Sequence, residues 1–329
     1  MRMGRQLACS TLKMARTALT LLFILEAWLS FAQRATTFTA LSYNIENAFD
    51  TIHDEGKNDW EYCTGGERRW TTFRLFKKLR FISKVIASAD EDRPVDVIGL
   101  CEVENENVMN CLTKASPLRH MGYKYVMTES EDERGIDVAL LYSPFTFRLF
   151  AYESIRVNTE KRKTRDILHA SGSLTNGDTL DIYVVHLPSK RGGASALRFS
   201  LHATEILASH IDSVASSRTK PNIILLGDFN ADTNSPQIKR LTKERQLTAH
   251  TLHLKPGSYK YQGEWSTIDH ILSYLSSLSH KETKALPLPF LIQPDETNRG
   301  IKPLRTFLGT AYAGGVSDHL PVMSVFEWK

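Results

Sequence analysis

The sequence has no strong excess of charge of either sign. Its 41 Lys and Arg residues nearly balance its 37 Asp and Glu residues, which gives a formal net charge of +4 at pH 7. Residues 1–32 contain four basic residues and one acidic residue, so a chain that begins at Gln33 carries +4 less +3, or +1. Overall charge therefore gives no basis for nucleic-acid binding, which would need a local basic surface.

Cysteine is also scarce. Of the four cysteines, Cys63, Cys101 and Cys111 follow residue 32, and this odd number excludes a fully paired intramolecular framework. Cys101 lies in an apolar segment and is expected to be a core thiol. In an oxidising compartment, Cys63 and Cys111 would be able to form a disulfide. Both the disulfide and two free thiols remain alternatives.

The chain has no apolar run as long as a membrane span, which takes about 20 residues. The apolar run over residues 18–32 follows a basic segment, contains Glu26 and ends in small residues at alternate positions. This pattern is typical of a secretory signal peptide cleaved before Gln33. We therefore expect residues 1–32 to be removed and the protein to be periplasmic or secreted. A retained N-terminal anchor is the alternative.

Internal repeats, low-complexity tracts and long linkers are absent from residues 33–329, whose composition is that of a globular protein. About 300 residues is near the upper limit for one hydrophobic core. We therefore predict a single domain over residues 33–329.

Short β-rich runs recur along this domain, and several are continuous stretches of Val, Ile and Leu, as in strands covered on both faces. We predict strands over residues 38–43, 95–101, 123–127, 138–142, 182–186, 223–227, 268–272 and 322–326. We predict helices over residues 71–89, 194–214 and 237–245. Many strands with a few long helices favour a layered α/β sandwich. A doubly wound single sheet is the alternative, although helices do not follow each strand.

Polar residues gather where these strands end. Asn44 and Glu46 follow the first strand in the segment YNIEN, and Glu102 ends a strand in GLCE. Side-chain oxygens are the ligands that Mg²⁺ and Ca²⁺ prefer, and a carboxylate that ends a buried strand must be solvated, paired or bound to metal. Asn44, Glu46 and Glu102 are therefore candidate metal ligands. The alternatives are a turn-forming Asn and, at Glu102, a helix N-cap or a surface acid.

The strongest local signal is the segment IILLGDFNAD, in which an apolar strand ends in Asp228 and Asn230. Because side chains alternate along an extended chain, these two point to the same side. A carboxylate and an amide that meet at one point can activate a water and hold a phosphoryl oxygen. A plain turn is the alternative.

Near the C-terminus, the segment VSDHLP places Asp318 beside His319 just before an apolar strand. Adjacent side chains in an extended segment point apart, so we expect His319 to meet the reacting phosphate and Asp318 to turn toward a metal. Upstream, Asp269 in TIDHIL is a candidate partner that fixes the tautomer and orientation of His319. The neighbouring His270 is expected to be structural.

Another strand contains Tyr183 and ends at His186, before a basic loop, in the segment YVVHLPSKR. A phosphodiester needs donors on its non-bridging oxygens, and His186 with Tyr183 or Lys190 can provide them. Arg165 is a further candidate for substrate binding, and so is Arg134. The alternative is a strand followed by a solvated basic loop, with both arginines at the surface.

Six segments, taken in their order along the chain, resemble the endonuclease/exonuclease/phosphatase family, which includes deoxyribonuclease I. They are YNIEN, GLCEVEN, YVVHLPS, GDFN, TIDHIL and SDHLP. The resemblance runs from about Leu41 to the C-terminus, and the ordered set is far more specific than any one segment. Asp137 and the segment RDI at Arg165 resemble bacterial exported members. The family implies an α/β four-layer sandwich, in which two mixed β-sheets pack face to face between outer helices.

The resemblance also implies a metal site at one edge of the sheets. Asn44 and Glu102 would hold Mg²⁺, with Mn²⁺ or Ca²⁺ as alternative ions, and Asp318 would lie nearby. Asp228 and Asn230 would act on the nucleophile or the leaving group. The implied reaction is in-line attack of water on phosphorus, in which the metal neutralises developing charge on oxygen.

Three further roles follow from the same resemblance. His319, paired with Asp269, would stabilise or protonate the phosphate. His186 matches the position at which deoxyribonuclease-like members carry His, and Tyr183 matches a phosphate-contacting Tyr.

The leading hypothesis is an exported Mg²⁺-dependent nuclease that acts on DNA or RNA, as a monomer and without a stable protein partner. A phosphatase, or a phosphodiesterase of the sphingomyelinase or inositol-phosphate type, is the alternative on the same site. A secreted binding protein without catalysis is the third hypothesis, but every expected acid, amide and imidazole is present. Substrate determinants are expected in the loops over residues 51–69 and 252–265, whose aromatic residues would stack on bases, pack the loops or meet lipid.

Overall fold

The computed structural model describes residues 37–157, 159, 163–189 and 193–329. The predicted signal peptide, residues 1–32, and the predicted substrate-binding Lys190 lie outside the described residues. Within these residues no helix has both the length and the apolar character needed to cross a bilayer.

Two six-stranded sheets form the centre of the protein. The first sheet has the order β13-β18-β1-β2-β4-β3 and the second has the order β5-β6-β7-β8-β12-β9. The first consists of β13 (Leu278–Ala285), β18 (Val322–Trp328), β1 (Thr37–Ala48), β2 (Val97–Val103), β4 (Asp137–Tyr142) and β3 (Lys124–Met127). The second consists of β5 (Phe147–Ile155), β6 (Ile167–Leu174), β7 (Thr179–His186), β8 (Asn222–Asp228), β12 (Asp269–Leu275) and β9 (Thr248–Ala249).

Both sheets are mixed. The pairs β1/β2 and β7/β8 are parallel, and the remaining neighbours are antiparallel. Three small hairpins complete the described strands: β10 (Tyr259–Tyr261) with β11 (Glu264–Ser266), β14 (Ile292–Pro294) with β15 (Ile301–Pro303), and β16 (Phe307–Leu308) with β17 (Ala311–Tyr312).

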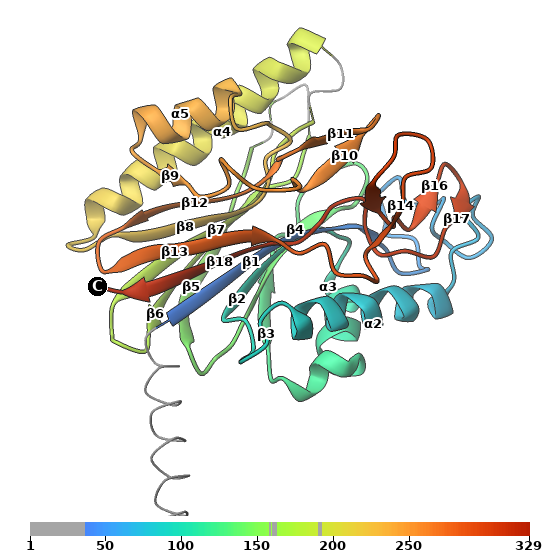
Figure 1. The fold of residues 1–329 in the computed structure, drawn as a ribbon, viewed down its shortest axis with the longest axis horizontal. Coiled ribbons are helices and arrows are strands. Elements are labelled where there is room, and N and C mark those ends of the chain that lie inside the picture. The colour runs from blue at the N-terminus through green and yellow to red at the C-terminus, as the bar shows by residue number, and fades with distance from the viewer. Residues whose placement is uncertain (1–36, 158, 160–162, 190–192) are drawn as a thin grey trace, which may run out of the picture.

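Helices cover the outer face of each sheet. In Figure 1, α4 (Gly193–Ser217) and α5 (Pro236–Glu244) lie on one side of the paired sheets, and α2 (Thr72–Ser88) and α3 (Glu106–Asn110) lie on the other. A π-helical turn at Cys111–Ala115 and a 3₁₀ turn at Pro117–His120 follow α3. This arrangement confirms the predicted four-layer sandwich and rules out the doubly wound single sheet.

The core is divided by the two sheets into three layers. Ala40, Val184 and Leu226 belong to the layer between the sheets, whereas Tyr183 and Leu225 face α4 on the outer side of the second sheet. This alternation follows from the period of two in a β-strand. The alternation determines which side chains of a strand lie in the central layer, at whose edge the polar residues gather.

Helix α2 begins where the hydroxyl of Thr71 accepts a hydrogen bond from the backbone N–H of Arg74. Leu75, Leu79 and Ile82 then recur on the face that packs on the first sheet, at the three- and four-residue spacing of an amphipathic helix. A predicted stripe with a constant spacing of three residues is wrong at its start, because Phe73 and Phe76 are exposed.

The described cysteines are all free thiols. Cys101 is buried in a core strand, as expected, and its Sγ donates to the backbone carbonyl of Val185 at 3.2 Å. Cys63 and Cys111 are not joined in a disulfide.

Candidate active site

The polar residues gather at one edge, where both parallel strand pairs end. His186 on β7 and Asp228 on β8 lie at the same register, and Asp269 on β12 pairs with Asp228 from the other side. Asn44 on β1 reaches this group across the gap between the sheets, because its Nδ2 donates to Asp228 Oδ2 at 3.1 Å. The ends of β1, β7 and β8 thus bring together residues far apart in sequence, as predicted.

The backbone around this edge is strained. Glu46, Asn47, Glu102 and Asn230 all have positive φ, between 47° and 67°. Residues other than Gly adopt this region at a cost, and such residues cluster at functional sites. The β1/β2 register shifts after Asn44, and the β2/β4 register shifts around Glu102. These irregularities turn polar side chains out of the regular alternation and toward one point.

Asp228 is the centre of the group. Its Oδ1 accepts the backbone N–H of Asn230 at 2.8 Å, and its Oδ2 lies 3.6 Å from His186 Nε2 and 3.9 Å from His319 Nε2. Burial raises the pKa of Asp228 to about 7, and the charge of Asp269 acts in the same direction. The preceding Gly227 is required, because a Cβ there would lie 1.9 Å from the carbonyl oxygen of Val185.

His319 and Asp269 form the predicted pair. His319 Nδ1 and Asp269 Oδ2 are 2.7 Å apart, and both side chains are buried. Burial alone would lower the pKa of His319, but the charge of Asp269 and its hydrogen bond, with Asp228 also contributing, raise it well above its usual value. These charges favour the cationic form of the imidazole, and Nε2 lies 3.9 Å from both Asp228 Oδ2 and Asp318 Oδ1. The ring of Tyr259 lies beside it at 4.9 Å between centroids.

His186 has the opposite electrostatic character. Burial, followed by the charge of Arg165, lowers its pKa well below the usual value, so its ring is neutral. Its Nδ1 has no hydrogen-bond partner among the described residues. Two imidazoles of different charge thus flank Asp228, and a difference of this kind is typical of catalytic groups.

Carboxylates of the type that binds divalent cations lie at this edge. Glu102 Oε2 accepts the backbone N–H of Asn47 at 2.8 Å, while Oε1 lies 3.5 Å from Asn44 Nδ2. Glu46 and Asp318 lie on either side of Arg305, with one oxygen of each 3.0 and 3.1 Å from Arg305 Nη2. Burial, and next the charge of Asp318, raise the pKa of Glu46. Crowded carboxylates of this kind are the hard oxygen donors that Mg²⁺ prefers.

Asn44 contacts two of the site's carboxylates and stays a candidate metal ligand. Its Oδ1 accepts the backbone N–H of Glu46 at 2.9 Å, and its Nδ2 faces the carboxylates of Asp228 and Glu102. The second lone pair of Oδ1 remains available to a metal ion. Asn44 thus also orients Asp228, and Glu46 joins Asn44, Glu102 and Asp318 as a candidate metal ligand.

Tyr183 does not join the group, which corrects its expected contact with phosphate. It is three residues from His186 in a regular strand, so the two side chains lie on opposite faces of the sheet. Its hydroxyl is 2.9 Å from His210 Nδ1, in the layer under α4. His270, by contrast, is structural as predicted, since its ring nitrogens contact Thr251 Oγ1 and the carbonyl of Ala231.

Cationic side chains line one flank of the group. Arg165 lies 3.1 Å both from Asp132 Oδ2 and from the carbonyl oxygen of Leu187, and Leu187 also accepts a hydrogen bond from Asn230 Nδ2 at 3.0 Å. Arg134 is half-exposed and lies 3.7 Å from Glu102 Oε2. Both arginines are therefore beside the site, as expected.

Two cations at this edge were not predicted from the sequence. The buried Lys78 on α2 donates to the carbonyl oxygens of Glu46 and Val316 and to Thr306 Oγ1, and Arg305 joins Glu46 to Asp318. Lys78 carried a usable signal, because it lies on the apolar stripe of its helix. Arg305 lies in a loop without a recognisable pattern.

The aromatic residues of the two candidate substrate loops mainly pack the loops. Tyr62 stacks on Phe49 and Trp70 is buried beside it, whereas Trp60 and Tyr261 are exposed. A cavity of about 580 Å³ next to the first loop is lined by Glu55, Gly56, Lys57, Asn58, Ser130, Glu131, Glu133 and Lys163. It borders the segment that contains Asp132, the partner of Arg165, and does not include Asp228 or His319.

A family of known proteins matches most of the chain. Residues 39–328 match the model of the "Endonuclease/Exonuclease/phosphatase family". No curated protein matches the chain.

Solved structures share the fold at low identity. The human Nocturnin catalytic domain with bound sulfate is 19% identical with a TM-score of 0.58, over 89% of this chain and 95% of its own. A mannosyl-6-phosphatase of Bacteroides thetaiotaomicron is 16% identical with a TM-score of 0.59, over 89% and 99%. Truncated TDP2 of Caenorhabditis elegans is 13% identical with a TM-score of 0.57, over 88% and 98%.

Proposed function

The chain belongs to the endonuclease/exonuclease/phosphatase family, and from this premise we propose that it is a divalent-metal-dependent phosphoesterase that hydrolyses phosphodiesters of DNA or RNA. The observation that carries the proposal is the buried pair of His319 Nδ1 and Asp269 Oδ2 at 2.7 Å, with His319 Nε2 directed at Asp228. A fixed imidazolium beside a carboxylate of raised pKa can move a proton to or from a phosphoryl oxygen or a water.

Each residue of the group has a distinct part in this proposal. Asp228, held by Asn44 and by the backbone N–H of Asn230, accepts the proton of the attacking water. His319, held by Asp269, donates a hydrogen bond to the phosphate and stabilises its developing charge. An exchange of the base and acid roles between Asp228 and His319 would use the same residues.

The candidate metal ligands are Asn44, Glu102, Glu46 and Asp318. A bound Mg²⁺, or Mn²⁺ or Ca²⁺ in its place, would neutralise negative charge on the phosphate oxygens. Arg305 offsets the charges of the buried Glu46 and the half-buried Asp318, which explains how these two acids are tolerated together.

The nuclease assignment rests on the half-exposed Arg134, on Arg165 and on the exposed Trp60 and Tyr261, since cations and aromatic faces together suit a nucleic-acid strand. A phosphatase acting on a phosphorylated small molecule, or a phosphodiesterase acting on a lipid or inositol phosphate, is the alternative on the same group. A binding protein without catalysis is disfavoured, because the buried Asp228, Asp269 and His319 are all present and lie together, with His319 hydrogen-bonded to Asp269.

Hydrolysis of a substrate panel by residues 33–329 tests the substrate class. Plasmid DNA, RNA, sphingomyelin and inositol phosphates are each incubated with Mg²⁺ or with EDTA, beside an Asp228→Asn variant. We expect Mg²⁺-dependent nicking of DNA or cleavage of RNA that the variant lacks. Turnover of the lipid or inositol phosphate alone would move the assignment to the alternative, and no turnover would overturn the proposal.

We also propose that the protein is exported to the periplasm or the medium. The basic segment and the short apolar run of residues 1–32 support this. Expression of the full chain in a bacterium and N-terminal sequencing of the processed protein test it. A start at Gln33 in the periplasmic or extracellular fraction is expected, and an unprocessed cytoplasmic chain would contradict it.

A further inference from the structure

A second polar group lies on the other face of the second sheet, away from Asp228. Glu153 on β5, His169 on β6 and Tyr183 on β7 are aligned across three neighbouring strands, because Glu153 pairs with His169 and His169 pairs with Tyr183. His210 on α4 covers them, with its ring centroid 5.0 Å from that of His169. This group takes no part in the proposed hydrolysis.

One oxygen of this group faces two imidazole nitrogens. Glu153 Oε1 lies 2.9 Å from His169 Nδ1 and 3.3 Å from His210 Nε2, and all three atoms lie within 4.8 Å of one another. Ligand bonds of about 2.0–2.2 Å, as in zinc sites, imply spacings of roughly 3–3.5 Å between neighbouring ligands. The two distances that involve Glu153 are thus already close to those of a metal's coordination shell.

The outer nitrogen of each imidazole is held by another side chain. His169 Nε2 lies 3.1 Å from Asp181 Oδ1, and Arg218 fixes that carboxylate with contacts of 2.8 and 2.9 Å. His210 Nδ1 lies 2.9 Å from the hydroxyl of Tyr183. Metal-binding histidines typically have their second nitrogen held in this way, because the outer partner fixes the tautomer and the direction of the ring.

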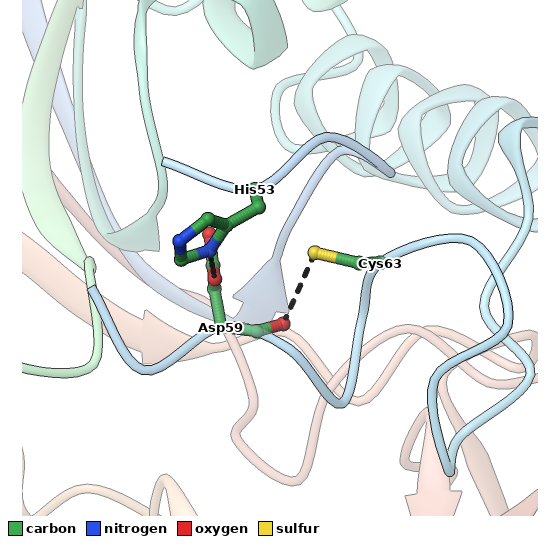
Figure 2. A group of neighbouring side chains, drawn as sticks. All are labelled: His53, Asp59 and Cys63. Atoms are coloured by element: carbon green, nitrogen blue, oxygen red, sulfur yellow. Dashed lines mark hydrogen bonds and ion pairs between the residues drawn. The ribbon is translucent and has the colours of Figure 1, made fainter. Parts of the chain in front are cut away.

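The loop after β1 contains another trio of metal-ligand types, but it is less well arranged. Figure 2 shows His53 against the carboxylate of Asp59, while Cys63 is directed at the backbone carbonyl of Asp59, 3.7 Å from Sγ. The thiol there forms a hydrogen bond within the loop. The ligand atoms of both trios lie within 4.8 Å of one another. The group of Glu153, His169 and His210 differs because the second nitrogen of each imidazole is held by another side chain.

We propose that Glu153, His169 and His210 form a binding site for a divalent transition-metal ion of the zinc class, separate from the catalytic group. Two imidazoles and one carboxylate are a ligand set that binds zinc. The side chains of Glu153 and His210 are 57% and 24% exposed, so ions reach the site from solvent and water completes the coordination. The bound ion joins the edge strand β5 to helix α4.

Zn²⁺ binding to the mature protein, residues 33–329, tests the site. Affinity and stoichiometry are measured by competition with a chromophoric chelator, and Co²⁺ absorption reports nitrogen ligation. His210→Ala removes a ligand, and Glu153→Gln removes one at an exposed position where folding is not at risk. His202→Ala is the matched control, because His202 is an exposed histidine on the same helix. Circular dichroism without metal confirms that each variant folds.

We expect the wild type and His202→Ala to bind one more Zn²⁺ equivalent than His210→Ala, and to show a rise in Tm with Zn²⁺ that His210→Ala lacks. Glu153→Gln should weaken binding at least about tenfold. Tyr183→Phe, which removes only the outer partner of His210, should weaken it by about tenfold. Equal affinity and stoichiometry in all variants would overturn the proposal and leave an ion-paired network of Glu153, His169 and His210.

Discussion

The orientation of a single imidazole depends on Asp269. One carboxylate oxygen is bonded to His319 Nδ1 at 2.7 Å, and the other has no hydrogen-bond partner among the described residues. Asp269→Asn keeps the shape but presents an amide that cannot stabilise the imidazolium. We expect the rate of hydrolysis to fall by roughly 10²–10⁴-fold, as when the carboxylate of a catalytic triad is replaced. Steady-state kinetics measures this, and activity within threefold of wild type would show that His319 needs no such partner.

Lys78 is a buried cation that holds three acceptors together. Its Nζ lies 2.6 Å from the carbonyl oxygens of Glu46 and Val316 and 2.5 Å from Thr306 Oγ1. Lys78→Met removes a donor from all three acceptors, of which Val316 keeps a hydrogen bond from Thr306 Oγ1 at 3.1 Å, and it removes the charge that offsets the Glu46 carboxylate. We expect a loss of about 3–5 kcal/mol in the free energy of unfolding, measured with urea. The exposed Arg80→Met on the same helix is the control, and a loss for Lys78→Met as small as that of the control would refute this role.

Much of the catalytic group could be predicted from single residues, because acids and imidazoles at the ends of apolar strands have few roles other than a functional one. Asp228, Asp269 and His319 were found in this way. Tyr183 was misplaced by the resemblance, although the three-residue spacing from His186 already puts the two on opposite faces of a strand. Arg305 could not have been found, since nothing local indicates which acids a loop residue will meet.

Most strands with both faces buried were predictable. β2, β4, β7 and β8 are buried along nearly their whole length, and each was predicted within a few residues of its bounds. The buried β6 was missed, because His169, Ser171 and Ser173 interrupt its apolar residues. β5 and β13 were missed because their residues are mostly exposed or half-buried. An edge strand of this kind is extended because it pairs with a neighbouring strand. Neither the hydrophobic period nor the composition of its sequence therefore reveals it.

The contact between β9 and β13 provides a test of pH dependence. His250, just after β9, stacks on His280 of β13 with ring centroids 3.8 Å apart. Burial, and next the charge of His280, lower the pKa of His250 to about 3 from its ordinary 6.5. Between these values the unfolded chain binds a proton that the folded chain does not, so stability is full above pH 6.5 and is lost as the pH falls toward 3.

The expected slope from this residue is at most about 1.4 kcal/mol per pH unit. Urea unfolding of wild type and His250→Asn between pH 7 and pH 5 measures it, and the variant should lose stability less steeply. Equal slopes would mean that His250 is protonated in the folded protein as easily as in the unfolded chain.

The whole molecule depends on the close approach of the two sheets, and Gly99 permits it. A Cβ at Gly99 would lie 3.0 Å from the Cβ of Leu226 and 3.2 Å from Cγ1 of Val184, both on the opposite sheet. Gly99→Val must therefore push the sheets apart, and we expect a loss of about 1–3 kcal/mol in the free energy of unfolding. Because Asn44 reaches Asp228 across the same gap, hydrolysis should fall as well. Unchanged stability and activity would show that the central layer can accommodate the added methyl groups.

The layered architecture was predictable, because many buried strands and few helices leave few ways to cover every apolar face. The ordered motifs indicated the same fold through their resemblance to a family. Substrate specificity was not, because it depends on loops whose aromatic residues divide between packing and exposure. Tyr62 and Trp70 turned inward while Trp60 and Tyr261 stayed exposed, and no local pattern separates them.

The most direct test of the account is the Mg²⁺-dependent rate of hydrolysis by His319→Ala, on whichever phosphodiester the wild type cleaves fastest, with the Tm of both proteins measured alongside. The account predicts a rate at least about 10²-fold below that of wild type, with a Tm that shows an intact fold. A folded variant that retains the wild-type rate would show that the buried group around Asp228 and His319 is not the catalytic site.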